Sequence, residues 1–283
     1  MPKTRWKPFP HPDKVYDYAG TRLKEQWPRL HNGDREAYPT LAELKKLVER
    51  HKEFAPSGSL EQAAAALQDA WRAYHRGDFG QAVELGLSVG PLGYNVANKA
   101  ANIYATYLET SEPARLKLLL ESAERAEFVF TRDKSVANAW YFHAQALGRY
   151  SQGISVVKAL AQGLGGKVRS SLEHAIRLEP RHADAHIAFG AYHAEIISKV
   201  GALLGGLTYG ASQDEAVKHF ETALKLNPHS AIAHIEYANG LAMMFGKAEL
   251  ARATRLYEEA AKCPAADAME RLDAEMANSE LEG

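Results

Sequence analysis

Residues 214–228 read DEAVKHFETALKLNP, and this stretch decides the fold class. Its apolar residues recur at steps of three and four, which places Ala216, Phe220 and Ala223 on one face of a helix. Pro228 stops that helix, because proline has no backbone N–H and clashes with the preceding turn. The stretch therefore predicts an amphipathic helix that packs through two small residues and one aromatic ring.

The same pattern occurs elsewhere in the chain, which indicates a repeat. Residues 168–186 read VRSSLEHAIRLEPRHADAH, residues 216–234 read AVKHFETALKLNPHSAIAH, and a weaker third copy covers 253–264. Each copy is a helix, a proline stop and a short turn toward another helix. Helical periodicity continues from residue 59 onward, and no strand-like alternation persists. The sequence therefore predicts an all-α fold.

These repeats resemble the tetratricopeptide repeat (TPR) family, in which small residues let two helices approach and an aromatic ring fills the gap beside them. The resemblance implies a right-handed stack of helix hairpins, a diverged TPR-like α-solenoid over about residues 59–264. The residues that carry it are Ala70, Trp71, Gly77, Asp78, Phe79, Ala82, Trp140, Ala144, Ala175, Pro180, Phe189, Gly190, Ala216, Phe220, Ala223, Pro228, Tyr237, Ala238, Gly246, Ala253, Tyr257 and Ala260.

Two inserts interrupt this pattern. The prolines at 180 and 228 are 48 residues apart, whereas a usual repeat has about 34 residues. The extra residues fall at 197–212, and a sister insert with a similar Ala-Leu and Gly-Gly pattern falls at 153–167. Over about residues 138–276 this combination resembles bacterial relatives of the regulator-of-microtubule-dynamics family. The Gly-Lys pair at 166–167 lacks the other residues of a phosphate loop, so close helix packing is the preferred interpretation of the inserts.

The two ends of the chain differ in composition from the middle. Residues 1–58 hold seven of the 12 prolines, many aromatic residues, and 12 Lys/Arg against 8 Asp/Glu. They predict an extended N-terminal arm with short helices, at 14–26 and 40–51, lying along the body of the protein. Residues 265–283 hold one Arg and six Asp/Glu, which predicts an acidic C-terminal helix or tail.

The composition excludes several classes of function. The formal net charge of −1 provides no general field for binding nucleic acid. The single cysteine, Cys263, fits a reducing compartment. The sequence has no signal-peptide core and no apolar run long enough to span a membrane, so we expect a cytoplasmic location.

Catalytic and metal-binding patterns are weak. No catalytic constellation is present, so we expect a protein that is not an enzyme and has no cofactor. His182, His186 and His193 lie on one helix face at i, i+4 and i+11, a weak candidate metal site. No HExxH motif or nearby cysteine supports that site, so we expect no metal.

The resemblance to TPR proteins implies a concave groove lined by the first helix of each hairpin. By register, its binding residues are Trp71, Tyr74, Tyr141, Gln145, Arg149, Asp184, Glu195, Asn239 and Met243. A mixture of aromatic, amide and charged side chains suits an extended peptide.

The sequence therefore favours a non-catalytic scaffold or adaptor that binds a protein segment. It leaves open whether the N-terminal arm occupies the groove. One alternative is a protein that binds a small apolar molecule or lipid in a cavity closed by the inserts. Another is a structural homo-oligomer.

Overall fold

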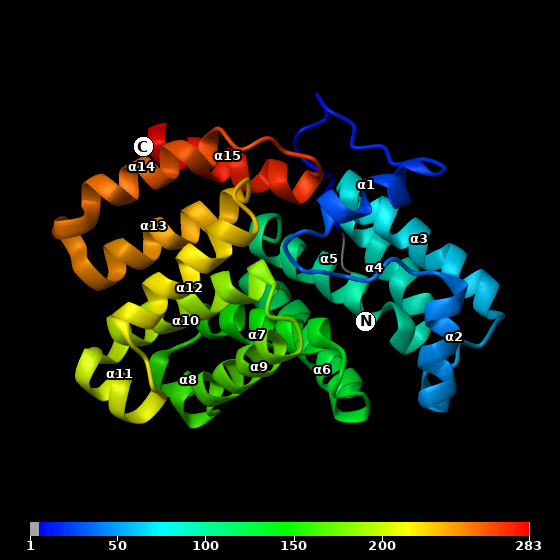
Figure 1. The fold of residues 1–283 in the computed structure, drawn as a ribbon, viewed down its shortest axis with the longest axis horizontal. Coiled ribbons are helices and arrows are strands. Elements are labelled where there is room, and N and C mark those ends of the chain that lie inside the picture. The colour runs from blue at the N-terminus through cyan, green and yellow to red at the C-terminus, as the bar shows by residue number, and fades with distance from the viewer. Residues whose placement is uncertain (1–5, 283) are drawn as a thin grey trace. The chain divides into compact units, whose positions relative to one another are not determined.

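Helices dominate the computed structural model, which describes residues 6–282 and contains no strand among them (Figure 1). The all-α prediction is confirmed. The described residues form two compact units: the first contains residues 6–29 and 36–153, and the second contains residues 30–35 and 154–282. This division cuts the predicted repeat region at Gly153 and assigns a short piece of the predicted arm to the second unit.

The first unit is a series of helices that pack on their neighbours in chain order. α3 packs on α4, α4 on α5, α5 on α6 and α6 on α7, as helices joined by short connections do. Its elements are α1 (Arg22–Leu30), α2 (Leu41–Arg50), the 3₁₀ turn Lys52–Phe54, α3 (Leu60–Arg76), α4 (Phe79–Ser88), the 3₁₀ turn Gly90–Gly93, α5 (Tyr94–Tyr107), α6 (Glu112–Arg132) and α7 (Ala137–Gln152).

Local sequence signals set the bounds of the first repeat helix, α3. The Ser59 side chain accepts a hydrogen bond from the Gln62 backbone N–H, and the Gln62 side chain caps the Ser59 backbone in return. Gly77 ends the helix in the left-handed conformation at φ 92°, which favours glycine. α4 begins two residues later, so the predicted tight helix hairpin forms here.

The second unit contains the repeats that the opening stretch predicts. α10 packs on α9, α12 and α13, α13 packs on α14, and α15 packs on both α13 and α14. Its helices are α8 (Val156–Ala161), α9 (Leu164–Leu178), α10 (Ala183–Val200), α11 (Ala202–Tyr209), α12 (Gln213–Leu226), α13 (Ala231–Phe245), the 3₁₀ turn Gly246–Glu249, α14 (Leu250–Ala261) and α15 (Ala268–Glu282).

Phe220 is the centre of the packing between α10, α12 and α13. Its ring is fully buried and stacks on Tyr237, with ring centroids 5.0 Å apart. A Cβ added at Gly190 would lie 2.8 Å from this ring, and one at Gly240 would lie 2.6 Å from it. Both helices can approach the ring only because these positions carry no side chain. The aromatic-between-small-residues pattern is thus present as predicted.

Each insert contains a short extra helix. α8 lies between α7 and α9 in the chain, and α11 lies between α10 and α12. Gly201 and Gly210 flank α11 at φ 82° and 61°, values that favour glycine, and reverse the chain at both ends of the helix.

The N-terminal arm differs in part from its prediction. A helix was expected at 14–26, but α1 covers Arg22–Leu30. The reason is a turn at Gly20, where φ is 59°, a value that interrupts a right-handed helix. The helix expected at 40–51 is confirmed as α2. The acidic C-terminal segment forms α15, whose Leu272 and Ala277 are buried.

Candidate functional site

The N-terminal arm packs against helices of the first unit, and one of its contacts is to Trp71, a predicted groove residue. Trp27 packs edge-on against Trp71, with ring centroids 5.6 Å apart, and Trp6 packs edge-on against Tyr104 at 4.4 Å. Trp71 and Tyr74, two of the predicted groove residues, are both buried. The arm itself therefore contributes to the cover over Trp71.

Side chains of α3 bind the backbone of the arm. Gln68 Nε2 donates to the Pro39 carbonyl oxygen at 3.1 Å. Arg72 donates from Nε to the Tyr18 carbonyl and from Nη2 to the Gly20 carbonyl, each at 3.1 Å. The arm is not helical at these three positions, so its carbonyl groups are available to accept.

Glu36 of the arm is held by α5 and α7. Asn95 Nδ2 lies 3.2 and 3.0 Å from the two carboxylate oxygens of Glu36, and Asn138 Nδ2 donates to one of them. The Glu36 carbonyl oxygen accepts from Trp27 Nε1 at 2.8 Å. Three repeat helices, α3, α5 and α7, thus bind one irregular segment at residues 36–40 through both its backbone and its carboxylate.

Two further predicted groove residues join a polar chain between α5 and α7. Gln145 Nε2 donates to the Tyr141 hydroxyl at 3.2 Å, and Asn102 Nδ2 donates to Gln145 Oε1 at 2.9 Å. Arg149 lies near the end of α7 and donates to Gln152 Oε1 at 3.2 Å. Tyr141 and Gln145 therefore contact their neighbours in the repeat.

In the second unit, residues 30–35 of the arm cap the ends of two helices. The Asp184 backbone N–H, in the first turn of α10, donates to the Gly33 carbonyl at 3.2 Å. Asn32 Nδ2 donates to the Leu226 carbonyl at the end of α12, at 3.1 Å. Helix ends leave such groups without partners inside the helix. The loop at residues 30–35 thus binds one backbone N–H group of α10 and one backbone carbonyl group of α12. Its contact with α10 is at the predicted groove residue Asp184.

The other predicted groove residues of the second unit are Glu195, Asn239 and Met243. Glu195 forms an ion pair with Lys199, with Oε2 and Nζ 3.0 Å apart. Asn239 Oδ1 accepts from the Tyr257 hydroxyl at 2.6 Å, and Met243 is exposed. The nine predicted residues are divided between the two units, and their role in binding stays a prediction.

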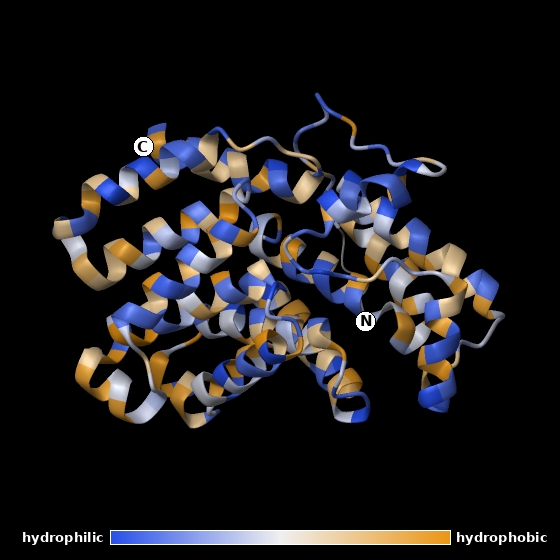
Figure 2. Ribbon diagram, in the orientation of Figure 1, coloured by the Kyte–Doolittle hydropathy of each residue, from blue (hydrophilic) through white to orange (hydrophobic). Residues whose placement is uncertain are grey.

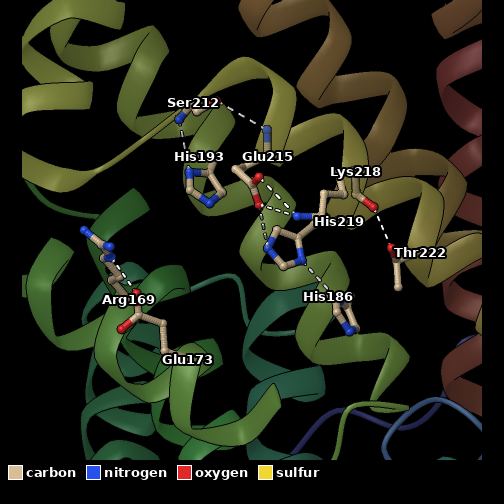
Figure 3. A network of polar contacts seen from close by, with 9 residues as sticks. All are labelled: Arg169, Glu173, His186, His193, Ser212, Glu215, Lys218, His219 and Thr222. Carbon is tan, nitrogen blue, oxygen red and sulfur yellow. Dashed lines mark hydrogen bonds and ion pairs between the residues drawn. The ribbon is translucent and has the colours of Figure 1, made fainter. Parts of the chain in front are cut away.

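A cluster of histidines fills the space between α10 and α12 (Figure 3). His186 Nδ1 and His219 Nδ1 are 2.8 Å apart, and the His193 ring stacks on the His219 ring with an interplanar angle of 13°. Phe189 stacks on His193, with ring centroids 4.7 Å apart. The cluster therefore combines polar ring atoms with tight aromatic packing.

The hydrogen bonds assign a neutral tautomer to each ring. His186 Nε2 lies 3.2 Å from the Pro180 carbonyl, which can only accept, so Nε2 carries the proton and Nδ1 accepts. His219 must then donate from Nδ1, and its Nε2 lies 4.0 Å from Glu215 Oε2. His193 Nδ1 accepts from the Ser212 backbone N–H at 3.2 Å. A second proton on His186 would place two N–H groups face to face.

Burial lowers the pKa of all three histidines. Burial lowers the pKa of His193 to about 4. Burial, with the neighbouring His186 and His193 acting in the same direction, lowers the pKa of His219 to about 4. Burial also lowers the pKa of His186, although its contact with the Pro180 carbonyl acts in the opposite direction. The cluster is therefore neutral near pH 7.

We expect the second unit to lose stability as the pH falls from about 6.5 to about 4. The ordinary histidine pKa is 6.5, so in this window the unfolded chain binds more protons than the folded chain. Each such histidine contributes a slope of about 1.4 kcal/mol per pH unit, and the slope vanishes above the window. Urea unfolding at a series of pH values, followed by far-UV circular dichroism, measures it.

The variant His219→Asn tests this assignment, because its amide can still donate to His186 but does not titrate. We expect this variant to lower the slope of unfolding free energy against pH by the contribution of one histidine. An unchanged slope in His219→Asn would contradict the assignment.

The three candidate metal ligands, His182, His186 and His193, do not point toward a common site for a metal ion. His182 Nδ1 accepts from the Ala185 backbone N–H at 3.1 Å and caps α10, while His186 and His193 contact His219. Within residues 6–282, no group of three or more His, Cys, Asp or Glu side chains has an arrangement that could hold a metal ion.

Sequence reasoning missed His219, Gln68, Asn95 and Glu36. His219 directly precedes Phe220, so a helix-face count from the repeat register could have placed it toward α10. Glu36 carries no such signal, since the residues around it have no period.

The comparisons with known proteins support the fold. No family model matches the chain, and no curated protein matches its sequence. Among solved structures, the chain is similar to a thermophilic TPR protein of Thermus thermophilus, with 18% identity, a TM-score of 0.54, and coverage of 77% of this chain and 99% of that one. The MamA protein also matches, at 16% identity over 79% of this chain and 97% of that one, with a TM-score of 0.37, too low to carry an argument.

The packed helix hairpins and the similarity to the Thermus thermophilus protein define an all-α helical-repeat fold. More specifically, its fold is TPR-like, similar to that of the thermophilic TPR protein. No helix among the described residues has both the length and the apolar composition needed to cross a bilayer.

Proposed function

We propose that this chain is a non-catalytic scaffold that binds an extended acidic segment of a partner protein on the faces of α3, α5 and α7. One observation carries the proposal: these faces already bind the chain's own residues 36–40. Glu36 receives hydrogen bonds from Asn95 and Asn138, while Gln68 binds the backbone at Pro39. A segment of similar shape and charge would find the same donors.

The chemistry of this surface supports recognition of a peptide. Donors aimed at backbone carbonyls favour an extended chain whatever its sequence, as in other peptide-binding modes. Two side-chain amides select for a carboxylate, because an apolar residue there would leave them unpaired. Within the arm, the Tyr38 ring of the segment packs edge-on against Trp27, with ring centroids 4.9 Å apart.

In this proposal the arm is a resident ligand that a partner must displace. A tethered segment competes at an effective concentration that reaches the millimolar range for short flexible linkers. A partner peptide would therefore bind the native chain weakly, and weakening the arm would raise its apparent affinity.

A fluorescent peptide with the sequence of residues 36–40, EAYPT, tests the proposal by anisotropy with the full chain. The double variant Glu36→Ala/Tyr38→Ala weakens the arm, because it removes the carboxylate that binds Asn95 and Asn138 and the ring that packs on Trp27. We expect the peptide to bind this variant at least about tenfold more tightly than the native chain.

Adding Asn95→Ala and Asn138→Ala to that variant should abolish the gain, and a peptide with lysine in place of its glutamate should bind neither protein. Hydrogen exchange of α5 and α7 confirms that the variants are folded. The absence of saturable binding to the double variant at millimolar peptide would refute the proposal.

The other functions predicted from the sequence stay predictions. A cavity for a small apolar ligand and self-association into a homo-oligomer each require their own measurement. Native mass spectrometry of the purified chain reports on both, since a retained ligand or a second copy changes the mass. Neither has a specific observation comparable to the bound segment at residues 36–40.

A further inference from the structure

Two short helices in the second unit, α8 and α11, present aliphatic side chains to solvent. On α11, Leu203, Leu204 and Leu207 are 76%, 59% and 79% exposed, and on α8 Val157 is 77% exposed. Contiguous exposed apolar surface marks interaction sites in soluble proteins. The insert patch, as we name it, consists of Val156, Val157, Leu160, Leu203, Leu204 and Leu207.

Packing on the inner side of α11 orients these leucines outward. Gly205 is the buried residue of this helix, and a Cβ there would lie 3.2 Å from Ile196 Cγ2. The leucines at 203, 204 and 207 fall on the remaining faces of the helix. The absence of a side chain at Gly205 therefore lets α11 lie flat on α10.

The two inserts contact each other near Gly165 and Tyr209. A Cβ at Gly165, at the start of α9 and just beyond α8, would lie 3.0 Å from Cε1 of Tyr209, the last residue of α11. Arg169 Nη1 also donates to the Tyr209 carbonyl at 3.0 Å. Figure 2 shows hydrophobic colouring along both short helices.

The charged side chains of the two inserts are all positive. Residues 153–169 and 196–212 contain Lys158, Lys167, Arg169 and Lys199 but no Asp or Glu, in a chain whose net charge is −1. Arg169 pairs with Glu173 and Lys199 pairs with Glu195. Lys158 and Lys167 are exposed on the inserts that carry the patch.

We propose that the insert patch is a docking surface for an anionic lipid bilayer. The exposed aliphatic side chains of α8 and α11 would enter the boundary between headgroups and acyl chains, while Lys158 and Lys167 contact lipid phosphate or carboxylate groups. The helices have six and eight residues, too few to cross a bilayer. They would therefore lie in the plane of the membrane surface.

The composition of the patch favours a lipid surface over a protein. The core of a protein interface is enriched in Tyr, Trp, Phe, Met and Arg, whereas the exposed members of this patch are only Leu and Val. A second copy docked face to face would bring the lysines of one copy toward those of the other. This surface shares no residue with the segment at 36–40 or the helices that bind it, so the inference does not rest on the proposed function.

Vesicle co-sedimentation of the full chain tests the inference. One set of vesicles contains only phosphatidylcholine, and the other also contains about 30 mol% phosphatidylserine. We expect the native chain to bind the anionic vesicles, with at least about tenfold weaker binding to the neutral ones. The variant Leu203→Gln/Leu204→Gln/Leu207→Gln should lower binding to anionic vesicles at least about tenfold, because it removes apolar surface from the patch.

A matched control replaces three exposed leucines elsewhere, Leu87, Leu250 and Leu281, with glutamine and should bind like the native chain. The variant Lys158→Glu/Lys167→Glu should lose the preference for phosphatidylserine. Unchanged melting by circular dichroism shows that the variants fold.

Failure of the native chain to bind anionic vesicles would overturn the inference. So would equal binding by the triple variant. A dimer that forms without vesicles, and that the triple variant abolishes in light scattering, would instead assign the patch to a second copy.

Discussion

Phe220→Ala is expected to lower the free energy of unfolding of the second unit by about 3–5 kcal/mol, the usual cost of truncating a buried aromatic side chain. The ring is fully buried between α10, α12 and α13, at two positions where glycine lets the helices approach. Those backbones cannot easily move inward, because the stacked Tyr237 ring holds α13 at its present distance from α12. The substitution therefore leaves a cavity.

Hydrogen exchange followed by mass spectrometry measures this loss locally, which matters because a chain of two units need not unfold in one step. Protection should fall in α10, α12 and α13. Leu207→Ala, at a leucine that is 79% exposed, is the control and should change stability by less than about 0.5 kcal/mol. Retained protection in α12 of the Phe220 variant would show that Phe220 does not support this packing.

Trp27→Ala is expected to have an effect of similar size in the first unit, about 3–5 kcal/mol. Trp27 is buried, packs on Trp71 and Tyr38, and donates a hydrogen bond to the Glu36 carbonyl. Its loss removes ring packing and also leaves a carbonyl without its donor. The effect should include release of residues 36–40 from α5 and α7.

Two variants separate these contributions. Trp27→Phe keeps an aromatic ring but loses the N–H donor, so it should recover most of the stability. Val15→Ala, at an arm residue that is 69% exposed, should leave stability unchanged. Hydrogen exchange of residues 36–40 and of α3 gives the measurement. If protection there is the same in Trp27→Ala and the native chain, the arm does not stabilise the first unit.

Local patterns in the sequence were sufficient to predict the repeat helices. Residues 213–226 form α12, and the chain turns at Pro228 as the missing N–H requires. The 48-residue spacing of the prolines at 180 and 228 also predicted extra residues at 197–212, where the structure has the end of α10 and the short helix α11. The sister insert, predicted at 153–167 from its similar sequence, contains α8 and the first residues of α9. The prediction for the arm was wrong at 14–26, since the turn at Gly20 outweighs the helical pattern on either side of it.

The candidate site depends on contacts that no local pattern contains. Glu36 is 59 residues from Asn95 and 102 residues from Asn138, and it lies in a segment with no periodicity. His219 meets two histidines of another helix, and burial there lowers its pKa. Neither environment is a property of a short stretch of chain.

The difference between what the sequence predicts and what only the structure reveals has a physical reason. Helix formation, proline stops and the small-residue positions depend on residues within a few turns of one another, so the sequence alone predicts that this chain builds TPR-like hairpins. Which groups the arm satisfies, which histidines become neutral and which leucines stay exposed depend on long-range packing, because burial and hydrogen-bond partners exist only once the helices have come together.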